Sequence, residues 1–136
     1  MPEAACWLLL LGSSRDDDGP MRAALAQLER CGSARWLTPI RRFPADDGSG
    51  LLFHNALAAW QAACGETEAY AEIRRIETAL GRDRGRRDEV AIDIDLLARL
   101  SGGQWQAHAH ARDKREFARL LVRALLLQAG ITVIDA

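Results

Sequence analysis

The sequence has no strong charge imbalance and no apolar run long enough to cross a membrane. Its net charge is −1 over 136 residues, so no overall basic field favours nucleic acid. The apolar run at 6–11 is too short to span a bilayer. That run also lacks the basic n-region and small-residue cleavage site of a signal peptide. We therefore expect a cytoplasmic protein whose partners are neither nucleic acid nor membrane.

Cysteine is scarce and is not arranged for metal binding. Cys6, Cys31 and Cys64 are odd in number and far apart in the chain. They form no Cys-x-x-Cys pair and no Cys/His spacing typical of a zinc site. We expect reduced, buried thiols, which fits a cytoplasmic location.

The length and the apolar patterning predict one domain over residues 1–136. Hydrophobic residues make up 49% of the chain, enough to fill a single core. The patterning predicts strands at 6–11, 34–43, 51–60, 90–97 and 131–134, and helices at 20–31, 66–80 and 113–128. This βαββαβ order followed by αβ indicates an α+β, ferredoxin-like fold with an appended C-terminal helix and short strand. The helices would cover one face of the sheet and leave the other free to hold a ligand.

An acidic pair stands in the strand predicted at 90–97. Residues two apart on a strand point to the same face, so Asp93 and Asp95 should project together. Neighbouring carboxylates repel each other, and a magnesium ion removes the conflict while completing its shell with water and substrate phosphates. The alternative is an exposed strand face whose polar residues happen to be aspartate. Because aspartate is depleted in strands, we favour the metal site.

Four arginines lead into the acidic strand: Arg82, Arg84, Arg86 and Arg87. The planar guanidinium donates two parallel hydrogen bonds and therefore suits phosphate. The alternative is a solvated loop, balanced by Asp83, Asp88 and Glu89. Beside the acidic pair, a polyphosphate clamp is the better interpretation.

Two other signals are weaker. Gly12-Ser13-Ser14 lacks the full phosphate-loop pattern, and Asn55 with Phe53 could hold a flat heterocycle.

Several motifs resemble those of the 6-hydroxymethyl-7,8-dihydropterin pyrophosphokinase family. In chain order they are Leu11-Gly12-Ser13-Ser14, Phe53-His54-Asn55-Ala56, Ile76-Glu77 with Leu80-Gly81-Arg82-Asp83-Arg84, Ile92-Asp93-Ile94-Asp95-Leu96-Leu97, and Arg115-Glu116-Phe117. They correspond to the family's Leu-Gly-Ser-Asn, Phe-Leu-Asn-Ala, Ile-Glu and Leu-Gly-Arg-x-Arg, Asp-x-Asp and Arg-x-Phe. The resemblance covers most of the chain. It implies transfer of pyrophosphate from ATP to the pterin hydroxymethyl oxygen, with release of AMP.

The resemblance also implies roles for individual residues. Two magnesium ions would be held against the triphosphate of ATP by Asp93 and Asp95. The catalytic set would be Arg82, Arg86, Asp93 and Asp95. ATP would be surrounded by Glu77, Arg84, Arg87, Arg115 and a histidine, either His110 or His108. The pterin would be held by Gly12, Phe43, Pro44, Phe53, Asn55 and Phe117.

The chain departs from the family pattern just before the acidic strand. The family has Arg-Trp-Gly-Pro-Arg there, whereas this chain has a shorter segment with no tryptophan, and Val90 replaces the last arginine. Compensation would have to come from Arg86 or Arg87. Two rival hypotheses follow. One is a paralogue that binds nucleotide or pterin without efficient transfer. The other is a ferredoxin-like interaction module, for example one that binds RNA, which the acidic strand disfavours. For the enzyme we expect a monomer or a weak homo-oligomer.

Overall fold

The computed structural model describes residues 5–83, 85–86 and 89–136. The strands are β1 (Ala5–Ser13), β2 (Ser33–Trp36), β3 (Arg41–Pro44), β4 (Leu52–Ala62), β5 (Asp93–Ser101), β6 (Gln104–Ala107) and β7 (Val133–Ile134). The helices are α1 (Gly19–Glu29), α2 (Glu66–Ala79), α3 (Ala109–Asp113), the short 3-10 helix η1 (Glu116–Ala118) and α4 (Leu120–Ala129). In this described part the chain is an α+β protein with four α-helices and one seven-stranded sheet.

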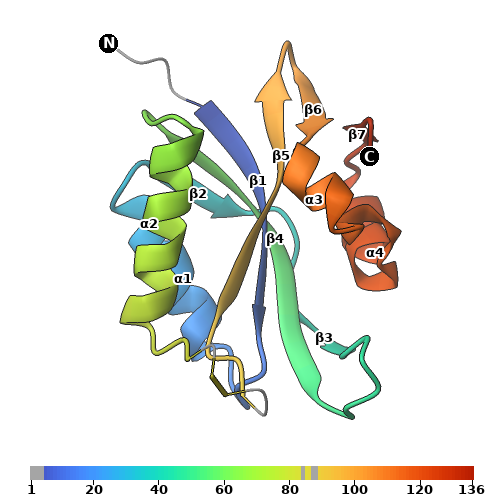
Figure 1. The fold of residues 1–136 in the computed structure, drawn as a ribbon. Coiled ribbons are helices and arrows are strands. Elements are labelled where there is room, and N and C mark those ends of the chain that lie inside the picture. The colour runs from blue at the N-terminus through green and yellow to red at the C-terminus, as the bar shows by residue number, and fades with distance from the viewer. Residues whose placement is uncertain (1–4, 84, 87–88) are drawn as a thin grey trace.

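The sheet is mixed and open, with β1 near its centre (Figure 1). Its order is β2-β4-β1-β5-β6-β7, and β3 pairs with β4 further along the edge that β2 occupies. β1 is antiparallel to both β4 and β5, whereas β6 and β7 are parallel. A strand that lies between two neighbours and is covered on both faces has a continuous apolar sequence. This position explains the apolar sequence of β1.

Alternate residues of β1 enter two separate cores. Trp7, Leu9 and Leu11 pack in the core beneath α1 and α2, while Leu8 and Leu10 pack in a second core with α3 and α4. Figure 1 shows α1 and α2 on one side of the sheet and α3 and α4 on the other. The prediction of a ligand face left free of helices was therefore wrong in part: the C-terminal helices cover one end of that face. Within the described residues, the end of that face that carries the first residues of β5 borders two hollows.

Most predicted elements in the first two thirds of the chain are present with shifted ends. The helices at 20–31 and 66–80 correspond to α1 and α2, and the strands at 6–11 and 51–60 to β1 and β4. The single strand predicted at 34–43 was wrong, because β2 and β3 are separate. Between them the hydroxyl oxygen of Thr38 accepts from the backbone N–H of Leu57 at 3.0 Å, just before Pro39, which has no N–H to give to a ladder.

The C-terminal third differs more from prediction. The strand expected from residue 90 begins at Asp93, and the turn at Gly102 is followed by β6, a strand that was not predicted. The single helix expected at 113–128 is instead α3, η1 and α4. Arg115, in the left-handed region with φ of 59°, interrupts the run because a non-glycine residue there cannot continue a right-handed helix. Within the described residues, no helix is long and apolar enough to cross a membrane.

Candidate functional site

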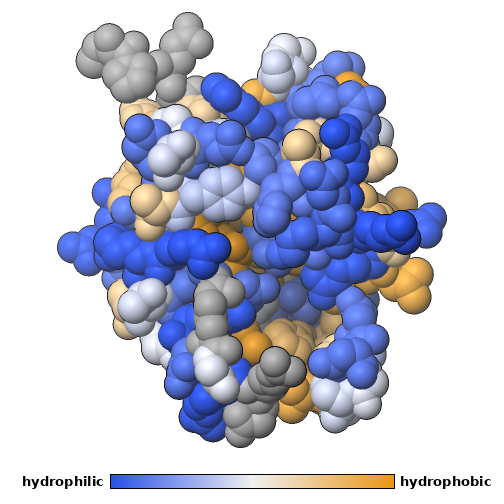
Figure 2. All heavy atoms as spheres, in the orientation of Figure 1, coloured by the Kyte–Doolittle hydropathy of each residue, from blue (hydrophilic) through white to orange (hydrophobic). Residues whose placement is uncertain are grey.

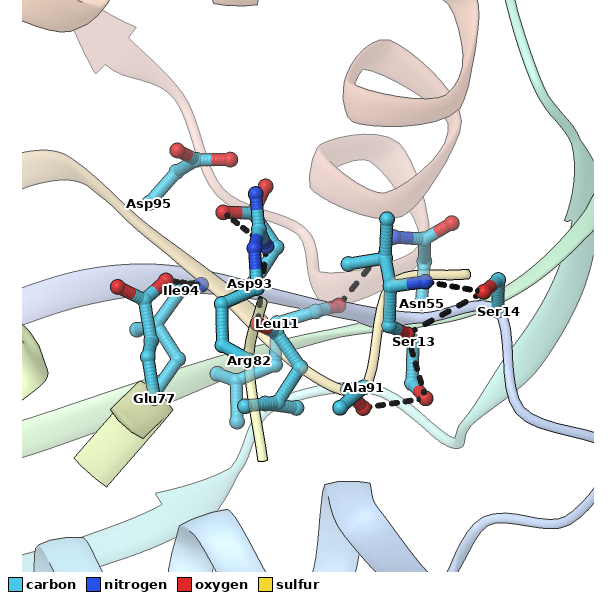
Figure 3. Close-up of polar contacts among 12 residues, drawn as sticks. Leu11, Ser13, Ser14, Asn55, Glu77, Arg82, Ala91, Asp93, Ile94 and Asp95 are labelled. Atoms are coloured by element: carbon cyan, nitrogen blue, oxygen red, sulfur yellow. Dashed lines mark hydrogen bonds and ion pairs between the residues drawn. The ribbon is translucent and has the colours of Figure 1, made fainter. Parts of the chain in front are cut away.

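The acidic pair lies on the open end of the sheet. Asp93 is opposite Gly12 of β1 and Asp95 is opposite Leu10, so the two carboxylates share one face. Figure 3 shows both projecting to the same side of β5. Ile92, Ile94 and Leu96 are buried in the other core. The strand alternation therefore places these side chains as the sequence predicted.

Charged neighbours surround the pair unequally. The Nη1 atom of Arg82 lies 3.2 Å from Oδ1 of Asp93, while Nζ of Lys114 lies 3.7 Å from Oδ1 of Asp95. The Asp95 side chain is only 19% exposed. Burial, together with the charges of Asp93 and Glu116, raises the pKa of Asp95 to about 8, and Lys114 opposes this only in part. Without a further cation, the site thus favours a protonated Asp95.

Two hollows meet at the acidic pair, and both include Asp93 and Asp95 in their walls. The larger, of about 260 Å³, is lined by residues that include Gly12, Pro44, Phe53, Asn55, Arg82, Val90 and Arg119. The smaller, of about 100 Å³, is lined by residues that include Tyr70, Arg74, Glu77, His110, Lys114 and Glu116. Figure 2 shows hydrophobic residues in a recess near the middle of the view, between hydrophilic residues. The pair therefore stands between two chemically different surfaces.

The larger hollow has an amide group in its floor. The Nδ2 atom of Asn55 donates to the carbonyl of Leu11 at 3.3 Å. Within the described residues, its Oδ1 atom is buried without a hydrogen-bond partner. A Cβ atom at residue 12 would lie 2.7 Å from Nδ2 of Asn55, so Gly12 leaves the space that this amide occupies. An unpaired buried acceptor is costly, and a ligand that donates a hydrogen bond would satisfy it.

Two side chains hold the first residues of β5 in place. The backbone N–H of Ile94 donates to the buried carboxylate of Glu77 at 3.0 Å, and Nη1 of Arg82 donates to the carbonyl of Ile92 at 3.0 Å. Because β6 pairs with β5 only from residue 98 onward, this edge of β5 has no neighbouring strand among the residues that the structure describes. Buried backbone groups need partners, and Glu77 and Arg82 supply them. The acidic pair is thereby fixed on a rigid element.

Most residues predicted for the pterin lie together, and the exceptions are aromatic. Gly12, Pro44, Phe53 and Asn55 line the larger hollow with Arg82, Asp93 and Asp95. Phe43 and Phe117 pack instead against the core beneath α4. The sequence pattern does not distinguish Phe43 and Phe117 from the residues of the larger hollow, because their position depends on how α4 packs on the sheet.

The residues predicted for ATP are divided among three places. Glu77 and His110 line the smaller hollow, whereas His108 contacts Tyr70 and Glu66. Arg115 borders a separate hollow beside Phe117. Arg86, which was predicted for the catalytic set and not for ATP, pairs with Glu89 at 3.1 Å. Arg84 and Arg87 lie outside the described residues. Of the two histidines considered for ATP, His110 is therefore the one that lines the smaller hollow with Glu77.

Several residues at the site were missed by sequence reasoning. They are Tyr70, Arg74, Lys114, Glu116 and Arg119. Tyr70 and Arg74 are one helical turn apart on α2 and precede Glu77, so the helical period could have indicated Tyr70 and Arg74 as its neighbours. The other three follow from the break at Arg115, for which the sequence carries no clear sign.

The carboxylates of Asp93 and Asp95 suit magnesium better than they suit a metal whose ligands all come from the protein. In the described ranges, no group of three or more His, Cys, Asp or Glu side chains is placed to hold a metal. Magnesium is commonly bound by one or two carboxylates, with water and substrate phosphates completing the shell. Asp93 and Asp95 supply that number. The pKa of Asp95 is raised first by burial and then by the charge of Asp93, and a divalent cation would offset both effects.

No protein-family model matches this chain, and no curated protein sequence matches it either. Its function must therefore be inferred from its own side chains and their arrangement.

Proposed function

We propose that this chain is a magnesium-dependent pyrophosphokinase, which transfers pyrophosphate from ATP to 6-hydroxymethyl-7,8-dihydropterin. The observation that carries the proposal is the position of Asp93 and Asp95 between two hollows. One is lined by residues that the resemblance assigns to the pterin, and the other by Glu77 and His110, which it assigns to ATP. Metal-binding carboxylates between acceptor and donor are what phosphoryl transfer requires.

The strand order supports the ferredoxin-like expectation. With β2 and β3 taken as one interrupted edge, the first four strands lie in the order β2/β3-β4-β1-β5. Helices α1 and α2 follow β1 and β4 in the chain and pack on one face. This is the arrangement expected for a βαββαβ unit, to which β6, β7, α3 and α4 are additions. The proposed site lies on the face opposite α1 and α2.

The acceptor would be held by shape and by one polar anchor. Gly12 and Phe53 leave a surface beside Asn55 on which a flat heterocycle can lie. The unpaired Oδ1 of Asn55 would accept a hydrogen bond from a pterin N–H group. Such fixed contacts lower the entropy cost of bringing the hydroxymethyl oxygen to the phosphate.

The transfer itself would depend on positioning and charge. Bound magnesium would neutralise the triphosphate. Asp93 and Asp95 would orient the metal and thereby the β-phosphorus, while Arg82, next to Asp93, would place positive charge beside the phosphates. The hydroxymethyl oxygen forms a bond to the β-phosphorus, the bond from that phosphorus to the AMP oxygen breaks, and the hydroxyl proton is released.

A coupled assay of AMP release with the pterin and Mg-ATP tests this proposal. We expect pterin-dependent AMP formation that falls at least 100-fold in Asp95→Asn. The matched control is Asp113→Asn, an acidic residue at the end of α3 outside both hollows. Absence of pterin-dependent AMP in the wild-type chain would overturn the enzymatic function.

A second candidate is a binding protein of the same ancestry that transfers pyrophosphate poorly. It is favoured by Val90, which lines the larger hollow at the position where the resemblance expects an arginine. Calorimetry separates the two functions from an unrelated interaction module. Magnesium-dependent binding of ATP without AMP release supports the second candidate. If the chain binds neither ATP nor the pterin, both candidates are rejected.

A further inference from the structure

Arg119 is placed where an arginine was not expected. It immediately precedes α4 and lines the larger hollow together with Asp93 and Asp95. Its side chain is 32% exposed, so a ligand in the hollow can reach it. Its Nε atom donates to Oδ2 of Asp46 at 2.8 Å, and its Nη1 atom lies 3.4 Å from each carboxylate oxygen of Glu116.

The guanidinium is held charged by its neighbours. Burial opposes the positive charge, but Asp46, Glu116 and Asp95 more than offset this and raise the pKa of Arg119. Its present partners are thus carboxylates, which occupy the same two-oxygen geometry that a phosphate group offers. An anion entering the hollow could replace Asp46 without leaving the guanidinium unpaired.

The hollow carries acidic charge that a metal must first balance. Its walls include Asp46, Asp47, Asp93 and Asp95, against Arg82 and Arg119. A polyphosphate alone would meet this excess of acidic side chains over arginines and be repelled. Magnesium at the acidic pair would cancel this excess, and both arginines could then face the polyphosphate from different elements. Arg119 should therefore matter only when magnesium is present.

The arginine that the sequence motif indicated lies elsewhere. Arg115, of the Arg115-Glu116-Phe117 motif, has a left-handed backbone and borders a hollow lined by Arg112, Phe117, Ala118 and Ala136. We propose that Arg119 is the polyphosphate-binding arginine of this site. In this role it would replace both Arg115 and the arginine missing at position 90. This inference rests on the proposed function, and it assigns the anionic part of ATP to the larger hollow beside the acidic pair.

A structural latch is the competing explanation for Arg119. Asp46 lies in the loop between β3 and β4, so its ion pair with Arg119 could serve only to hold that loop against η1 and α4. The two explanations predict different effects of Asp46→Asn on polyphosphate binding. If Arg119 is a latch, losing either partner has the same effect. If Arg119 binds polyphosphate, Asp46 competes with the ligand, and removing its charge should not weaken binding.

Titration calorimetry tests the proposal. The ligand is an ATP analogue that carries a methylene bridge between its α- and β-phosphates. For Arg119→Gln we expect affinity about 10- to 100-fold lower in magnesium, as for loss of a charged hydrogen-bond pair. Arg119→Lys should give a smaller loss, because a lysine keeps the charge without the planar fork. Asp46→Asn should bind as tightly as wild type or several-fold more tightly.

The matched control is Arg123→Gln, an exposed arginine one turn further along α4 and outside both hollows, which should bind like wild type. Thermal unfolding checks that each variant is folded. Equal losses in Arg119→Gln and Asp46→Asn, or a loss in Arg115→Gln that exceeds the loss in Arg119→Gln, overturn the proposal. The proposal is also overturned if Arg119→Gln lowers the affinity for the pterin but not the affinity for the ATP analogue. Absence of analogue binding by the wild-type chain instead rejects the proposed function on which it rests.

Discussion

The backbone N–H of Ile94 donates to the carboxylate of Glu77 at 3.0 Å, although the two residues belong to different elements. The contact ties α2 to the edge of β5 that β6 does not reach, between the two aspartates. It gives Glu77 a structural role that the sequence resemblance, which implies a place beside ATP, did not indicate. Both roles are compatible, because Glu77 also lines the smaller hollow.

Glu77→Ala and Glu77→Gln should separate these two roles. The alanine variant leaves a buried N–H of Ile94 without its acceptor, which should lower the free energy of unfolding by about 1–3 kcal/mol. The glutamine variant keeps an acceptor oxygen and should stay within about 1 kcal/mol of wild type. Urea denaturation measures both. Exposed Glu68 on the same helix provides the control variant Glu68→Ala, and equal stability of Glu77→Ala and this control would contradict the structural role.

Gly12→Ala should disturb the amide in the floor of the larger hollow. The new Cβ would lie 2.7 Å from Nδ2 of Asn55, so the amide must move away from Leu11. We expect a stability loss of about 1 kcal/mol, at the low end for overpacking, because the amide can rotate. Pterin affinity, measured by fluorescence titration, should fall more than stability does. Adding Asn55→Ala to Gly12→Ala should remove the stability loss, and a double-mutant cycle without such coupling would contradict the predicted clash.

The raised pKa of Asp95 makes stability and metal binding depend on pH in opposite senses. In the metal-free fold, Asp95 keeps its proton up to about pH 8, whereas its unperturbed value is 3.8. Between these values the folded state binds more protons than the unfolded state, so stability falls as pH rises. Magnesium requires the ionised carboxylate, so its affinity should rise across the same range and binding should release protons.

Chemical denaturation in EDTA at pH 5 and pH 8 tests the first part of this prediction, and Asp95→Asn should show a smaller loss of stability toward pH 8. Calorimetry of magnesium binding in two buffers of different ionisation enthalpy tests the second part. A proton release of zero at pH 6 would show that Asp95 is already ionised in the free protein.

The two neighbouring histidines should behave differently when replaced. His108 is 16% exposed, and its Nδ1 lies 3.3 Å from the hydroxyl of Tyr70 while its Nε2 contacts Glu66. His110 is exposed at the smaller hollow. His108→Ala should therefore lower stability by about 1 kcal/mol with little change in ATP affinity. His110→Ala should lower ATP affinity at unchanged stability, and the reverse pattern would reject this assignment.

The sequence by itself determined the features that depend on local periodicity. The alternation around Asp93 and Asp95 puts both carboxylates on one face because side chains on a strand alternate with a period of two. The apolar runs of β1 and β4 and the stripes of α1 and α2 follow from the same kind of short-range rule. Gly12, Asn55 and the acidic pair could therefore be expected to be neighbours once the strand order was assumed.

Only the tertiary structure decided how distant segments share the site. Whether Arg115 or Arg119 reaches the larger hollow depends on the left-handed turn at Arg115 and on the packing of α4 across one end of the sheet. The carboxylate of Glu77 meets Ile94 because, in the described part of the chain, β6 does not extend along the edge of β5 that faces away from β1 at this residue. These contacts join residues far apart in the chain or depend on a single backbone angle. Apolar patterning carries no information about either, so the acidic pair with Gly12 and Asn55 was predictable, while the contacts of Arg119 and Glu77 were not.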